Sequence, residues 1–98
     1  MEKRIKIPTI GEILIEEFLE PLNFSAYGLA KHINVPSSRI LDIIHRKRRI
    51  SIETGLKLSR YFGMSDRFFI DLQTTIDIRN EKITLTNELA KIEPAIAG

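Results

Sequence analysis

The sequence predicts an all-α fold of about five short helices in a bundle, followed by a C-terminal helical extension. Apolar residues recur at spacings of three and four along most of the chain, and Pro or Gly separates successive patterns. The 98 residues are enough for one domain with a modest core. The hydrophobic fraction of 43 % and the charged fraction of 29 % are ordinary for a folded, water-soluble chain.

Several classes of protein are disfavoured by what the sequence lacks. There is no cysteine, so disulfides and thiolate metal sites are excluded. No apolar run approaches the roughly 18 residues of a membrane span, and we expect no signal peptide. His32 and His45 have no metal-ligand cluster or nucleophile beside them in the sequence. We therefore expect no metal, no cofactor and no enzymatic activity.

The chain divides into three parts: a flexible lead-in at residues 1–8, a helical domain at 9–79 and a helical tail at 80–98. Thr9 and Glu12 have the spacing of a capping box, which predicts a first helix over residues 10–20. Pro21 ends it, because the residue before a proline resists the helical region. The expected buried stripe of this helix is Ile10, Ile13, Leu14 and Phe18.

Residues 25–50 contain two short amphipathic patterns joined by a tight turn. Ser25 is a suitable N-cap for the second helix, and Gly28 inside that helix suggests close approach of a neighbouring helix. Asn34 is expected at positive φ in the turn. Pro36 fits the first position of a third helix, over residues 36–45. The pattern predicts a helix-turn-helix.

The outer face of the third helix is polar. A helix in the major groove reads base edges with the side chains of its first turns, and we assign this role to Ser37, Ser38, Arg39 and Asp42. The alternatives are a salt bridge from Arg39 to Asp42, and plain N-terminal capping by the two serines.

Basic residues concentrate directly after this helix. Residues 36–50 contain five basic side chains against one acidic one, although the net charge of the whole chain is only +2. We assign the run Arg46, Lys47, Arg48 and Arg49 to DNA phosphates, with a solvated loop as the alternative. Ser25 and Tyr27 are added as phosphate contacts, with simple packing as the alternative for Tyr27.

Two more helices are predicted before the tail. Ser51 should cap the fourth, which Gly63 ends, and its inward face is expected to contain Ile52, Gly55, Leu56, Ser59 and Phe62. Ser65 should cap the fifth. Its apolar residues exceed one narrow stripe, so they are assigned to the core or to a dimer interface: Phe68, Phe69, Leu72 and Ile76.

The order of these segments resembles the HigA/VapI antitoxins, within the Xre/Cro group of helix-turn-helix repressors. The likeness is carried by GEILIEEFLEPLNFS, SAYGLAKHINVPSSRI, ISIETGLKLSRYFGMS and FFIDLQ, and covers about residues 8–78. It implies a lambda-repressor-like bundle, a homodimer and a cytoplasmic location. It also implies repression of the chain's own toxin–antitoxin operon through palindromic operator DNA, and neutralisation of an mRNA-cleaving toxin of HigB type.

Three positions differ from the pattern of these antitoxins. Ser25-Ala26 replaces the usual Ser-Gln, Asn34 replaces the turn glycine, and His45-Arg46-Lys47-Arg48 replaces Asn-Gly-Lys-Arg. Arg46 adds basicity where a glycine is usual. Two other functions therefore stay open. One is a stand-alone or phage-type repressor without a toxin. The other is a protein-interaction module that has lost DNA binding, which is suggested by Ala26 at the position where these antitoxins usually have glutamine.

Overall fold

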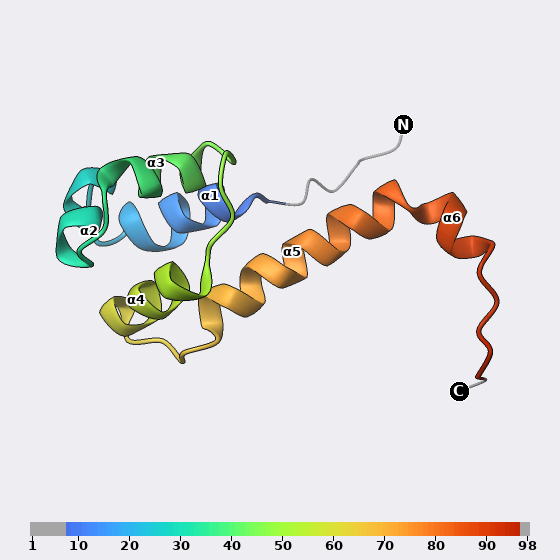
Figure 1. Cartoon of the computed structure of the whole chain (residues 1–98). Helices are drawn as coiled ribbons and strands as arrows, with labels where there is room; N and C mark the ends of the chain where they lie inside the picture. The colour runs from blue at the N-terminus through green and yellow to red at the C-terminus, as the bar shows by residue number, and fades with distance from the viewer. Residues whose placement is uncertain (1–7, 97–98) are drawn as a thin grey trace.

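The computed structural model describes residues 8–96, which form helices and connecting turns without a β-strand (Figure 1). Most of the predicted lead-in at 1–8 lies outside the described residues. The elements are α1 (Ile10–Ile13), η1 (Leu14–Leu19), α2 (Ala26–His32), α3 (Ser37–Ile44), α4 (Ile52–Phe62), α5 (Phe68–Thr84) and α6 (Thr86–Ala90). No helix in this part of the chain is long and apolar enough to cross a membrane.

The first helical segment begins as predicted but winds differently. The Glu12 N–H donates to Thr9 Oγ1 at 3.1 Å, which confirms the cap. From Leu14 the helix has the wider π form, in which the Glu20 N–H donates to the Ile15 carbonyl five residues back. Leu19, at the end of the π-helical segment, is buried in the core, whereas the expected stripe at α-helical spacing omitted it.

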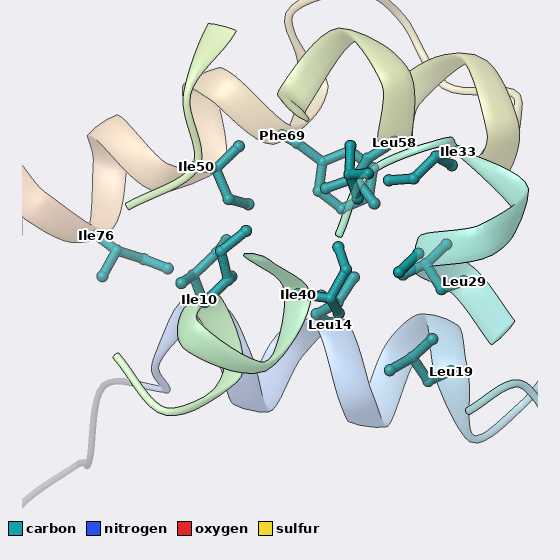
Figure 2. Close-up of a cluster of buried hydrophobic side chains, with 13 residues drawn as sticks. Ile10, Leu14, Leu19, Leu29, Ile33, Ile40, Ile50, Leu58, Phe69 and Ile76 are labelled. Atoms are coloured by element: carbon teal, nitrogen blue, oxygen red, sulfur yellow. The ribbon is translucent and has the colours of Figure 1, made fainter. Parts of the chain in front are cut away.

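The core lies where the first segment, α2, α3, α4 and the first half of α5 meet (Figure 2). Its fully buried members include Leu29, Ile40 and Ile43, as the amphipathic patterns of the second and third helices predicted. Figure 2 shows Ile50 and Ile76 directed toward Ile10, so the end of the α3–α4 loop is anchored against the start of α1.

Four helical segments end in the same left-handed turn. In each, the residue that follows the turn donates its N–H to a carbonyl five residues back, at 2.8–3.0 Å, which closes the exposed helix end. Of these four turn residues, only the last is a glycine. They are Asn23 (φ 57°), Asn34 (φ 58°), Arg46 (φ 62°) and Gly63 (φ 69°). The predictions for Asn34 and Gly63 are confirmed.

Glycine allows a close helix contact, but at Gly11 and not at Gly28. A Cβ on Gly11 would lie 2.4 Å from the carbonyl oxygen of Ile44, so the first helix crosses the end of α3 backbone to backbone. A Cβ on Gly28 would meet only Ser25 Oγ, at 3.1 Å. The prediction of a close approach at Gly28 is therefore wrong, and Gly11 has that role.

The predicted inward face of α4 is partly wrong. Ser51 caps the helix as expected, because its Oγ accepts the Thr54 N–H at 3.2 Å. Ile52 and Leu56, however, are exposed. The buried face is rotated toward a set that mixes polar and apolar residues: Thr54, Gly55, Leu58 and Ser59.

Helix α5 starts later and runs further than predicted. Its N-cap is Arg67 rather than Ser65, and no side chain caps it. The helix continues without interruption past residues 79 and 80, where the sequence placed the start of the tail. Its second half and α6 project from the bundle (Figure 1), and α6 has no buried residue.

Candidate nucleic-acid interface

The predicted base-reading residues lie together in the first turns of α3. Pro36 is the N-cap, with ψ 141°, and not the first helical residue as predicted. Because no side chain caps this helix, capping by the serines is ruled out as their role. Ser38 is exposed, and Ser37 and Asp42 are half-buried. The polar start of α3 therefore presents hydroxyl groups to the outside.

Arg39 is held by a residue that the sequence did not suggest. Its Nη1 lies 3.3 Å from Glu53 Oε1, so the alternative of a salt bridge to Asp42 is wrong. Glu53, in the first turn of α4, also accepts a contact from Lys57 Nζ at 3.2 Å. The Arg39 Nε is buried without a hydrogen-bond partner, and its side chain is only 24 % exposed. Arg39 thus lies along α4 with one end of its guanidinium bound to a carboxylate.

The two cations beside Glu53 change the pKa of its carboxyl group. The hydrogen bond and positive charge of Lys57, followed by the charge of Arg39, lower the pKa of Glu53 below its ordinary value of 4.5. Its carboxylate is therefore ionised at neutral pH and places a negative charge beside the predicted base-reading arginine.

The basic run forms the exposed loop after α3. Arg46, Lys47 and Arg48 are exposed and make no salt bridge with any residue in the 8–96 range. Arg49 differs from them, because its Nε donates to Asp77 Oδ2 of α5 at 2.6 Å. The structure therefore separates the predicted phosphate contacts into three unpaired cations and one that α5 already neutralises.

The start of α2 supplies the other predicted phosphate contacts. Ser25 caps the helix, since its Oγ accepts the Gly28 N–H at 2.9 Å. Tyr27 is 72 % exposed, so packing in the core does not account for it. Tyr27 and Ser37 line the same shallow hollow of about 300 Å³, together with Lys31. Sequence reasoning missed Lys31, because only the α2–α3 packing places it beside these residues.

The predicted dimer residues divide by exposure. Phe69 is completely buried and Ile76 is 7 % exposed, so these two belong to the core of the bundle and would offer a second copy almost no surface. Phe68 and Leu72 are half-buried against that core.

A helix-turn-helix family model matches residues 15–69. The chain belongs to the helix-turn-helix family. Over 69 residues it is 44 % identical to virulence-associated protein I of Dichelobacter nodosus. The matched residues are 70 % of this chain and 64 % of that protein, so the match spans slightly less than two thirds of the relative's length. An HTH-type transcriptional regulator of Haemophilus influenzae is 35 % identical over 95 residues, which are 93 % of this helix-turn-helix chain and 87 % of that one.

The fold is also that of a solved helix-turn-helix antitoxin. The Pseudomonas aeruginosa antitoxin HigA, solved with the higBA promoter, superposes with a TM-score of 0.84 at 29 % identity, over 93 % of this chain and 100 % of that chain. The predicted all-α bundle and the resemblance to HigA/VapI antitoxins are confirmed.

Proposed function

We propose that this helix-turn-helix protein is the antitoxin of a type II, HigBA-like toxin–antitoxin module, and that it represses its own operon by binding palindromic operator DNA as a homodimer. The observation that carries the proposal is the polar first turn of α3 beside three exposed cations that no acid in residues 8–96 pairs with. The likeness to HigA, which was solved with the higBA promoter, also supports DNA binding by this chain.

The proposal has a defined geometry and electrostatics. Two copies related by a twofold axis would present their α3 helices to successive major grooves, about 34 Å apart. Arg46, Lys47 and Arg48 of both copies would neutralise about six phosphates. Log K should then fall with log salt at a slope near −5.

The dimer contact is assigned to the projecting end of the chain. Ile78 and Ile83 of α5 are 54 % and 65 % exposed, and Leu89 of α6 is 43 % exposed. Apolar side chains on a segment that leaves the bundle favour a protein contact, and a second copy would satisfy the symmetry of a palindrome. Sedimentation of Ile83→Gln should show a shift toward monomer, whereas Leu22→Gln, at an exposed site in the turn before α2, should not. A dimer unchanged in Ile83→Gln would place the contact elsewhere.

The toxin part of the proposal rests on the family. We expect the chain to bind a small mRNA-cleaving toxin of HigB type, encoded beside it, and to hold that toxin inactive. Co-purification of the two products, with loss of RNA cleavage when this chain is added, would support it. A purified complex that still cleaves RNA would contradict neutralisation. An isolated gene would favour a stand-alone repressor.

The DNA part is tested by fluorescence anisotropy with the chain's own upstream duplex and a scrambled duplex, each at two salt concentrations. A sequence-reading repressor should prefer its own duplex at both salts, and Arg39→Ala should reduce that preference about 10-fold or more, as expected for loss of a guanine contact. Arg67→Ala is the matched control, because Arg67 pairs with Asp71 at the start of α5 and belongs neither to α3 nor to the loop that follows it. Equal binding to both duplexes that vanishes with salt would instead favour a protein-interaction module.

A further inference from the structure

The basic loop is tied to α5 by a side chain that the proposed function has not used. Gln73 is 5 % exposed, and its Oε1 accepts the Ile50 N–H at 3.0 Å. Its Nε2 donates to Asp77 Oδ1, also at 3.0 Å. The other oxygen of Asp77 accepts from Arg49 Nε at 2.6 Å. Gln73 and Asp77 thus hold the two residues with which the basic loop ends.

These bonds fix the loop where packing does not. A hollow of about 310 Å³ lies between the loop and α5, and it is lined by Arg46–Arg49 of the loop, by residues 8–10, and by Gln73, Ile76, Asp77 and Asn80 of α5. Only Ile50, at the end of the loop, reaches the core (Figure 2). A buried amide side chain with both ends bonded is also costly to disrupt, because its partners would be left unpaired.

We propose that Gln73 and Asp77 are positioning residues for DNA binding, and that Arg49 is a brace of the loop rather than a phosphate contact. This inference rests on the proposed function. In the resulting division of roles, Arg46, Lys47 and Arg48 contact phosphates. Arg49 forms a salt bridge with Asp77, and this salt bridge holds the other three cations in position. On this inference, Arg49 does not make the phosphate contact that the sequence suggested.

The salt dependence of DNA binding separates a brace from a phosphate contact. Each neutralised phosphate contributes about 0.9 to the slope of log K against log salt, so one residue lost from each protomer of a dimer reduces the slope by about 1.8. Arg48→Met should show this reduction. Arg49→Met should bind more weakly by a similar factor at every salt concentration, with the slope unchanged.

Two variants on α5 test the positioning residues themselves. Asp77→Asn keeps an oxygen for Gln73 but frees the charge of Arg49, so the slope should become steeper by up to about 1.8. Gln73→Met removes both hydrogen bonds at similar volume, and should weaken binding several-fold at every salt while the Ile50 amide exchanges faster with solvent. Leu58→Val, a core change away from the loop, controls for general loss of stability and should leave DNA affinity unchanged below the melting transition.

The decisive comparison is between the neighbouring arginines. If Arg49→Met lowered the slope as much as Arg48→Met, Arg49 would be a phosphate contact and the inference would be overturned. If Gln73→Met left the affinity for DNA unchanged, Gln73 would not be a positioning residue of the loop. If the wild-type chain bound neither duplex, the proposed function would fail. Hydrogen exchange of the Ile50 amide in Gln73→Met would still decide whether the hydrogen bonds of Gln73 order the loop.

Discussion

Replacing Arg46 by glycine should stabilise the fold and weaken DNA binding at the same time. Arg46 has φ 62°, in the left-handed turn that ends α3. A side chain in this conformation costs about 1–2 kcal/mol, because its Cβ crowds the following carbonyl. Glycine avoids that cost but gives the unfolded chain more freedom, which offsets about 0.5–1 kcal/mol. The net gain should be about 0.5–1 kcal/mol, or about 2–8 °C in Tm for a domain of this size.

Three substitutions at position 46 separate backbone strain from charge. Asparagine tolerates the left-handed region and carries no charge, whereas lysine retains both the charge and the strain. Unfolding in urea should therefore rank Arg46→Gly and Arg46→Asn above the wild type and Arg46→Lys. The salt slope of DNA binding should rank them in the opposite order, with a reduction of about 1.8 for the two uncharged variants in a dimer. If Arg46→Gly were no more stable than Arg46→Lys, the turn would not store the strain inferred from its φ angle.

Two further predictions concern helix contact and pH. Gly11→Ala should lower the free energy of unfolding in urea by about 2 kcal/mol or more, because its Cβ would lie 2.4 Å from the carbonyl oxygen of Ile44. Gly28→Ala should leave that free energy unchanged or raise it. Equal effects of the two substitutions would refute the close approach at Gly11. The pKa of Glu53 is lowered by folding, so its two ion pairs stabilise the fold above pH 4.5 and lose their effect as the pH falls through the lowered value. The difference in unfolding free energy between wild type and Glu53→Gln should therefore shrink with acidification, and a difference that grew instead would contradict the sign of the shift.

Four of the helix ends were predictable because their chemistry is local. Ser25 and Ser51 cap helices through hydroxyls that accept N–H groups three residues ahead, and both residues are visible as caps in the sequence. Asn34 and Gly63 take the left-handed conformation for which their small or polar side chains are suited. Arg46 could not be assigned this way from its own chemistry. Only the position of the turn after α3 reveals it.

The rotation of α4 was not predictable from spacing. Ile52 and Leu56 form an apolar stripe as regular as many buried ones, yet both face outward. The face that is buried includes Thr54 and Ser59, because Gly55 lets α5 approach so closely that a Cβ there would lie 2.7 Å from Ile70. A helical period shows that one stripe exists, but the neighbouring helix decides which stripe is covered.

The charge pattern of the interface shows the same limit. In the sequence, residues 36–50 carry five basic side chains, and nothing in that segment distinguishes one arginine from another. In the fold, Arg39 donates to Glu53 of α4, and Arg49 donates to Asp77 of α5. These partners are 14 and 28 residues away along the chain. The side chain of Glu53 is 60 % exposed, whereas that of Asp77 is 34 % exposed. Since exposed ion pairs are weak, we expect Arg39 to exchange Glu53 for a guanine, which offers two acceptors in the geometry of a guanidinium. Arg49 has a second bond to the same carboxylate and a buried glutamine behind it. We therefore expect acidic residues of distant helices to decide which of these arginines contact DNA.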